Sequence, residues 1–157
     1  MNFSFRPWYY DPLFWEIFLI DWISKWFAED FLYTPLKVTS FLSLRYSINR
    51  GISWSLFNGN NTITFVVISS LVFAILCFLA YYTLNRQKEG YNVLGETLLL
   101  AGGFSNFTDR LIYGGVVDFI SVSFGRWSFP IFNIADIAIS VGVMVILYQT
   151  FLGESEE

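Results

Sequence analysis

Acidic and amide side chains recur in three short blocks in the second half of this chain. The blocks are Asn106-Phe-Thr-Asp109-Arg110, Val116-Val117-Asp118 and Phe132-Asn133-Ile-Ala135-Asp136. The chain contains no histidine and a single cysteine, Cys77. These absences exclude a histidine-dependent nucleophile, a disulfide within the chain and a metal site built from His or several Cys. Carboxyl groups remain as the candidates for acid–base chemistry, and we expect no metal and no cofactor.

The composition is that of a membrane protein. Charged residues make up 14% of the 157 residues, whereas 55% are apolar and 21% aromatic. An ordinary soluble domain is about 25% charged, and a disordered chain is poor in aromatic residues. We therefore expect an α-helical integral membrane protein that forms a single domain over residues 1–157. The net charge of −4 gives no support to nucleic-acid binding.

Four apolar segments approach the length of about 20 residues that a membrane-spanning helix needs. The expected helices cover residues of about 13–28, 62–84, 92–111 and 133–152. The first contains Glu16, Asp21 and Lys25, so it lacks the uncharged core of a cleaved signal peptide and is expected to be retained. Four spans place both termini on the same side of the membrane.

A different pattern lies between the first two helices, over residues of about 36–58. Every second residue from Leu42 to Ile48 is apolar, and the alternation resumes after Asn49-Arg50-Gly51. Period two predicts strands, and Asn-Arg-Gly predicts a turn. Because open sheet edges are not stable in lipid, we expect a small sheet at the membrane surface with its apolar side toward the lipid. The alternating stretch from Asp118 to Phe124 is too short to assign.

With four spans, most ionisable and amide groups within the helices fall near one membrane face, whereas Glu16 and Glu96 fall toward the other. Each buried charge costs several kcal/mol, so a cluster at one depth predicts a functional site. The residues at that face are Asp21, Lys25, Asn106, Asp109, Arg110, Asp118, Asn133 and Asp136. The face also has more Lys and Arg in its loops, and taken literally the positive-inside rule places it in the cytoplasm.

The three blocks resemble the lipoprotein signal peptidase (signal peptidase II) family, whose pattern is Asn-x-x-Asp-Arg, Val-Val-Asp and Phe-Asn-x-Ala-Asp. Upstream, Asp21-Trp-Ile-Ser24-Lys25 resembles the family's Asp-x-x-Ser/Thr-Lys, and Asn49-Arg50-Gly51 resembles its Asn-x-Gly. The match covers essentially the whole chain. The departures from the pattern touch no acid, so we expect them to affect packing more than chemistry; they are Ser105, Trp22, Ser53 and Ser55.

The resemblance implies a membrane aspartyl endopeptidase that cleaves diacylglyceryl-modified prolipoproteins before their lipidated cysteine. It implies four transmembrane helices with a small extracytoplasmic β-sheet, a cradle, between the first two. The protein would lie in the inner (cytoplasmic) membrane with both termini cytoplasmic and the active site at the extracytoplasmic face, against the charge count. The expected partners are the lipidated prolipoprotein and membrane lipids, and we expect a monomer.

Asp118 and Asp136 are the expected catalytic pair, the first from a loop and the second from the start of the fourth helix. Two carboxyl groups a few ångströms apart share one proton, because both cannot ionise easily. The ionised member can take a proton from water, and the neutral member can donate one to the carbonyl oxygen and the leaving amine. The pair titrates as a unit, so neither role is assigned to one residue. Asp136 and Asn133 are also suited to capping the fourth helix.

The remaining residues of the pattern are expected to support the site or bind substrate. Asp21 and Lys25, four residues apart, form an ion pair or line the substrate site, and Asp109 and Arg110 either hold the loop or take part in chemistry. The full set is Asp21, Lys25, Asn49, Gly51, Asn106, Asp109, Arg110 and Asn133. The alternative function is a non-enzymatic four-helix transporter or ion-pathway subunit, which would need polar residues along the full membrane depth.

Overall fold

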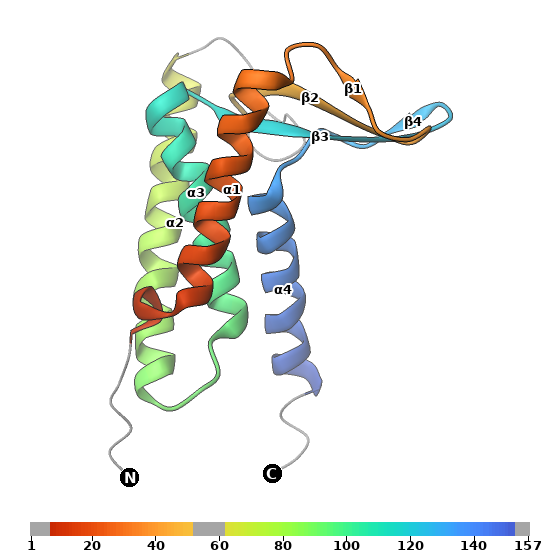
Figure 1. The fold of residues 1–157 in the computed structure, drawn as a ribbon. Coiled ribbons are helices and arrows are strands. Elements are labelled where there is room, and N and C mark those ends of the chain that lie inside the picture. The colour runs from red at the N-terminus through yellow and green to blue at the C-terminus, as the bar shows by residue number, and fades with distance from the viewer. Residues whose placement is uncertain (1–6, 52–61, 153–157) are drawn as a thin grey trace.

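The computed structural model describes residues 7–51 and 62–152, which form four long helices and a small antiparallel sheet (Figure 1). The helices run side by side, and the sheet projects sideways from one end of the bundle (Figure 1). The elements in order are η1 (Trp8–Tyr10), α1 (Pro12–Phe31), β1 (Leu36–Lys37), β2 (Leu42–Asn49), α2 (Thr62–Lys88), α3 (Leu94–Tyr113), β3 (Val116–Phe124), β4 (Trp127–Ser128) and α4 (Ile134–Leu152).

The four expected helices are present, with ends that differ by a few residues for identifiable reasons. Helix α1 begins at Pro12 because the Asp11 side chain caps it by accepting a hydrogen bond from Leu13 N. Helix α2 continues four residues beyond the apolar run, to Lys88, because polar residues are also good helix formers. Helix α3 ends at Gly114, whose positive φ of 66° is the left-handed conformation that closes helices.

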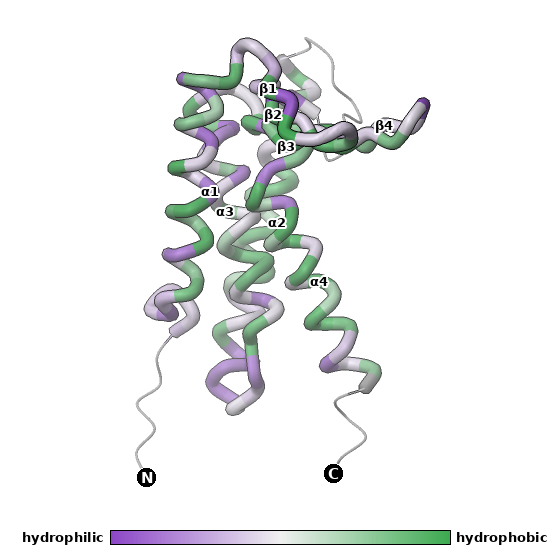
Figure 2. The backbone as a smooth tube through the Cα atoms, turned by 45° about the vertical axis from the view of Figure 1, so that its right-hand side comes forward, coloured by the Kyte–Doolittle hydropathy of each residue, from purple (hydrophilic) through white to green (hydrophobic). Residues whose placement is uncertain are grey.

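Two helices, α2 and residues Ile134–Phe151 of α4, are long and apolar enough to cross a membrane. Only 11% and 17% of their most apolar windows are buried inside the protein, so they are not the core helices of a soluble domain. Helices α1 and α3 carry more charged residues and do not meet the same criterion. Figure 2 shows this difference, because α4 is largely hydrophobic whereas hydrophilic residues recur along α1.

The expected small sheet is present, but one of its main strands comes from later in the chain. Its strand order is β1-β2-β3-β4, and β2 pairs antiparallel with β3 from Leu42↔Val122 to Asn49↔Val116. The stretch left unassigned in the sequence is therefore most of β3, and Asp118 lies in a strand rather than in the expected loop. The expected strand at 52–58 lies outside the described residues. Sequence alternation could not identify β3 because its partner is distant in the chain.

Small residues let α3 pack closely against α4 and α2. A Cβ atom added at Gly102 would collide with the carbonyl oxygen of Ala135, and one at Gly103 would collide with the Leu76 side chain. These glycines therefore permit a close approach of the helices. The contact at Gly102 brings the first turn of α4 against the middle of α3.

At the end of the bundle away from the sheet, Arg86 of α2 pairs with Glu96 of α3. Their Nε and Oε1 atoms are 3.0 Å apart, and the Glu96 side chain is 2% exposed. The Nε–H direction is not that of a hydrogen bond, so the attraction is that of two charges. The guanidinium also lies 5.8 Å and 4.7 Å from the ring centroids of Tyr82 and Tyr91. This pair joins α2 to α3 beside their connecting turn.

Replacing Arg86 with methionine should destabilise the protein by about 3 kcal/mol, because Glu96 would keep a buried charge without its cation. The double variant Arg86→Met with Glu96→Leu should recover most of this loss, because two apolar side chains need no partner. Unfolding of the micelle-bound protein by a denaturing detergent measures the difference. A double variant as unstable as Arg86→Met alone would contradict the pairing.

Candidate active site

Polar side chains from five elements meet at the end of the bundle that carries the sheet (Figure 1). All ten residues singled out in the sequence belong to one continuous network of hydrogen bonds and ion pairs. They are Asp21 and Lys25 of α1, Asn49 of β2 with Gly51 after it, Asn106, Asp109 and Arg110 of α3, Asp118 of β3, and Asn133 and Asp136 at the start of α4.

Lys25 is the centre of the buried part of this network. Its Nζ atom lies 2.7 Å from Asp21 Oδ2 and 2.8 Å from Asp109 Oδ2, and it donates a 2.7 Å hydrogen bond to Asn106 Oδ1. The three ionised side chains are at most 1% exposed. The ammonium thus uses all three of its hydrogens, and the ion pair between Asp21 and Lys25 proposed from their spacing is present.

Lys25 also determines how the two central amides point. An ammonium only donates, so Asn106 turns its oxygen toward Lys25 and its nitrogen toward Asp136 Oδ1, 2.9 Å away. The same Asn106 oxygen accepts a 3.1 Å hydrogen bond from Asn133 Nδ2, which also lies 2.8 Å from Asp118 Oδ1. Each candidate catalytic carboxyl group therefore receives an amide N–H whose direction follows from Lys25.

Asp118 is buried and held by amides on both of its oxygens. Besides Asn133 on Oδ1, Asn49 donates to Oδ2 at 3.2 Å, and the residue is 3% exposed. Burial, and then the negative charge of Asp136, raise the pKa of Asp118 to about 7. The hydrogen bonds from the two asparagines and the charge of Lys25 oppose this rise. A carboxyl group with this pKa can gain or lose a proton near neutral pH.

Asp136 makes the capping contacts expected from the sequence and also a contact with α3. Its backbone N–H donates to Asn133 Oδ1 at 2.9 Å, and its carboxylate Oδ2 accepts from the Asn133 backbone N–H at 3.3 Å. This reciprocal pair has the form of a capping box at the start of α4. The other oxygen, Oδ1, accepts from Asn106, so Asp136 caps its own helix and also belongs to the network.

Asp109 and Arg110 make contacts that hold the strands. Asp109 Oδ2 accepts a 3.1 Å hydrogen bond from the backbone N–H of Val117, which fixes β3 against α3. Arg110 Nη2 donates to the carbonyl oxygen of Gly51 at 2.5 Å, and Gly51 N–H in turn donates to Asn49 Oδ1 at 3.0 Å. The latter contact turns the Asn49 amide nitrogen toward Asp118.

A pocket of about 550 Å³ opens beside the network. Asp118 and Asp136 both line it, with Asn49, Asn106 and Arg110 as further polar groups. The rest of the wall is mainly apolar and includes Val72, residues 129–132, Ile137, Ile139 and Met144. Within residues 7–51 and 62–152, no group of three or more acidic or cysteine side chains could hold a metal ion. The arrangement suits proton transfer by two carboxyl groups beside an apolar ligand.

Ser105 is a member of the network that the sequence did not predict. Its hydroxyl donates a 2.6 Å hydrogen bond to Asp21 Oδ2, so the expectation that the departures touch no acid is wrong for this residue. The sequence did contain a signal for the role of Ser105, because this residue directly precedes Asn106 on an expected helix. The N–H of Ala135, 2.7 Å from Asp21 Oδ1, is a backbone group that no side-chain pattern reveals. Trp22 is exposed, and Ser53 and Ser55 lie outside the described residues.

A helical bundle with two bilayer-length apolar helices, and paired carboxyl groups in a pocket at one end, defines the class of a membrane-embedded enzyme. The family model described as "Signal peptidase (SPase) II" matches residues 13–152, and the chain belongs to this family of aspartic-type peptidases. The resemblance noted from the three sequence blocks is thereby confirmed.

Known proteins of the same family align along most of the chain. Proteins named lipoprotein signal peptidase from Wigglesworthia glossinidia brevipalpis and Rickettsia felis are 34% and 38% identical over 136 and 137 residues. These alignments cover 85% and 82% of this chain and 88% and 67% of the relatives. A bacterial membrane enzyme solved by the in meso method at 2.3 Å resolution has a TM-score of 0.69 and 29% identity, over 92% of this chain and 90% of its own.

The raised pKa of Asp118 predicts a pH-dependent stability difference between the wild type and Asp118→Asn. The folded-state pKa of about 7 exceeds the unfolded value of about 3.9, so the group's contribution to stability is complete below pH 4 and is lost as pH rises through 7. The wild type should therefore lose roughly 2–4 kcal/mol between pH 4 and pH 8 relative to Asp118→Asn. Thermal unfolding of both proteins across this range tests it.

The substitution also disturbs one hydrogen bond, because an amide nitrogen in place of one carboxylate oxygen would face Asn49 or Asn133 as a second donor. This loss of stability in Asp118→Asn does not change with pH. The test is therefore how the stability difference between the two proteins changes with pH, rather than its size at one pH. Parallel stability curves for the two proteins would contradict the raised pKa.

Proposed function

We propose that this protein removes signal peptides from diacylglyceryl-modified prolipoproteins by cleaving before the lipidated cysteine, with Asp118 and Asp136 activating the water. Membership of the signal peptidase II family supports the reaction, and the names of the relatives support the substrate class. The observation that carries the catalytic assignment is that both carboxyl groups line one pocket whose other walls are largely apolar.

The pair can supply an acid and a base from one shared proton. Below about pH 7 the pair holds that proton, because burial and the charge of Asp136 raise the pKa of Asp118. The ionised carboxylate removes a proton from water as its oxygen attacks the peptide carbonyl carbon. The protonated carboxyl group donates to the carbonyl oxygen, and a proton then passes to the leaving amine. The pair titrates as a unit, so the proton belongs to both residues.

The other network residues position this pair. Asn106 and Asn133 hold the carboxyl groups, Asn49 holds the far oxygen of Asp118, and Lys25 orients the amides. The remaining members, Asp21, Asp109, Arg110 and Gly51, hold the helices and strands that carry them. We propose a monomer as the active unit.

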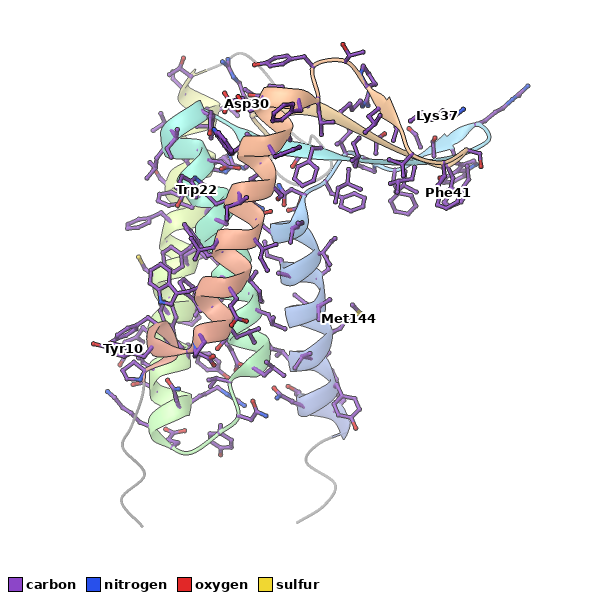
Figure 3. The ribbon with its side chains drawn as sticks, viewed as in Figure 1. Tyr10, Trp22, Asp30, Lys37, Phe41 and Met144 are labelled. Atoms are coloured by element: carbon purple, nitrogen blue, oxygen red, sulfur yellow. The ribbon has the colours of Figure 1, made fainter. Side chains whose placement is uncertain are left out.

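The apolar wall suits a substrate whose scissile bond lies next to a lipid. It runs from residues 129–132 above α4 to Met144 further along that helix, and Figure 3 shows Met144 on the outer side of α4. Apolar surface in contact with both the pocket and the bilayer can accommodate acyl chains at low cost. A peptide delivered in this way would meet the two carboxyl groups at the membrane edge, where water is available.

We propose that all four helices cross the membrane as one domain over residues 1–157. The charges that make α1 and α3 less apolar are largely turned inward, since Asp21, Lys25, Glu96, Asp109 and Arg110 are buried. Most outward side chains of α1 are bulky and apolar, including Trp15, Ile20, Ile23 and Phe27, although Glu16 and Asp30 are also exposed. Inward charges on outwardly apolar helices are typical of polytopic membrane proteins.

The proposed orientation in the cytoplasmic membrane has both termini inside and the site outside. The start of α1 and the end of α4 lie at the end of the bundle opposite the sheet (Figure 1). Two of the cations that weigh against this orientation, Lys25 and Arg110, are bound within the site. A bound cation contributes little to a count of free positive charge.

The apolar side of the sheet supports contact with lipid. Phe41 and Phe124 stack with centroids 5.5 Å apart and are 44% and 59% exposed, and Trp127 is 82% exposed. Figure 3 shows Phe41 on the side of the sheet toward α4 and Lys37 on the other side. Aromatic rings are enriched where a membrane meets water, so we propose that this side of the sheet lies on the lipid surface.

Asp118→Asn and Asp136→Asn should each lower kcat/KM by roughly a thousandfold or more, because each removes half of the acid–base pair. Cleavage of a synthetic diacylglyceryl-modified prolipoprotein in lipid vesicles measures this. Asp30→Asn, an exposed acid near the end of α1, is the control and should keep wild-type activity. Near wild-type cleavage by either folded dyad variant would refute the catalytic assignment.

The transporter alternative requires a polar path through the full depth of the bundle. Between the site and the Arg86–Glu96 pair lies a buried apolar cluster of Trp8, Phe14, Leu76, Leu100 and Ala101. This cluster interrupts such a path and favours the peptidase. Ion or solute flux through reconstituted vesicles that is lost in the Asp variants would favour the transporter.

A fluorophore placed at Phe41 should be strongly quenched by lipids with a quencher on the acyl chain, whereas one at Lys37 should not. The chain has one cysteine, the exposed Cys77, so Cys77→Ser provides a background for Phe41→Cys and for the matched control Lys37→Cys. Labelled proteins in vesicles give the two quenching curves. Equal quenching at both positions would contradict the proposed contact between sheet and lipid.

A further inference from the structure

The hydroxyl of Ser105 forms a buried link between α3 and α1. Ser105 Oγ lies 2.6 Å from Asp21 Oδ2, and both residues are fully buried. A hydroxyl bonded to a carboxylate at this distance is a charge-assisted hydrogen bond. Two other helix serines instead bond to the backbone of their own helix, Ser24 to the Asp21 carbonyl and Ser140 to the Asp136 carbonyl.

The other oxygen of Asp21 holds the start of α4. Oδ1 accepts a 2.7 Å hydrogen bond from the backbone N–H of Ala135, the residue that precedes Asp136. This N–H is among the first in α4, where helix amides lack partners and the helix dipole favours a negative charge. Asp21 therefore caps α4 from another helix and fixes the peptide next to Asp136.

The position of the Asp21 carboxylate depends on a balance between its donors. Lys25 attracts Oδ2 but also binds Asp109 and Asn106, so it pulls the carboxylate toward the centre of the network. Ser105 approaches the same oxygen from α3 and opposes free rotation of the group. Without the hydroxyl, Lys25 would be the one donor to Oδ2 in the described structure, and Oδ1 would be free to move away from Ala135.

Ser105 and Asn106 are neighbours on α3 and reach Asp136 by two routes. Asn106 donates directly to the Asp136 carboxylate, whereas Ser105 acts through Asp21 on the preceding peptide. We propose that Ser105 is a positioning residue for Asp136, which it holds in register with Asp118 through the Asp21 carboxylate. The proposal rests on the proposed roles of Asp118 and Asp136.

The variant Ser105→Ala tests the proposal, with Ser24→Ala as the matched control. Ser24→Ala removes a hydroxyl that touches the Asp21 backbone but not its carboxylate. Ser105→Ala should lower kcat by roughly 10- to 100-fold, the effect expected for a lost hydrogen bond to a charged group. KM should change little, because Ser105 does not line the pocket. Ser105→Thr, which keeps a hydroxyl, should recover a large part of kcat.

Amide exchange of Ala135 gives a second readout that does not depend on activity. In protein labelled with ¹⁵N-alanine, this N–H should exchange with deuterium faster in Ser105→Ala than in the wild type or Ser24→Ala. Unchanged exchange, unchanged kcat, or equal losses in Ser105→Ala and Ser24→Ala would overturn the proposal. Full activity in Asp118→Asn would instead show that the proposed dyad is wrong, and faster Ala135 exchange in Ser105→Ala would then support only the structural link.

Discussion

A buried lysine between two buried carboxylates is the interaction on which the rest of the site depends. Lys25 is surrounded by Asp21, Asp109 and Asn106, and an ammonium in a membrane helix is costly without such partners. Because an ammonium can donate but cannot accept a hydrogen bond, Lys25 fixes which end of the neighbouring amide faces it. Asn106, with its oxygen turned to Lys25, donates to Asp136, and Asn133 donates both to that oxygen and to Asp118.

This arrangement separates the acids that hold the fold from the two for which we propose a catalytic role. Asp21 and Asp109 share the charge of Lys25 and bind backbone N–H groups of α4 and β3. Among the residues that the structure describes, the side-chain hydrogen-bond partners of Asp118 are the amides of Asn49 and Asn133, with no cation. Its pKa is consequently raised by burial, whereas the neighbouring acids satisfy Lys25. Carboxyl groups of one type thus acquire different functions from their surroundings alone.

The sequence was most informative where the signal is local or where a motif is long. The helices followed from apolar length, and the ion pair of Asp21 with Lys25 followed from their spacing. Strand β3 was missed because its pairing with β2 joins residues about 70 positions apart, and pairing partners leave no mark on a single sequence. The contribution of Ser105 was missed because its effect depends on which helix lies opposite, and backbone donors such as Ala135 N–H have no side-chain pattern at all.

The capping box at the start of α4 has a consequence for biosynthesis. Asp136 acquires its orientation from Asn133, from Asn106 and, through Ala135, from Asp21, so it depends on the last helix being in place. During insertion of the nascent chain, α1 to α3 and the strands emerge first, and the pair of carboxyl groups is still incomplete. If the proposed pair is catalytic, the site is therefore complete only when the C-terminal helix docks, and a partly inserted chain would not act on peptides nearby.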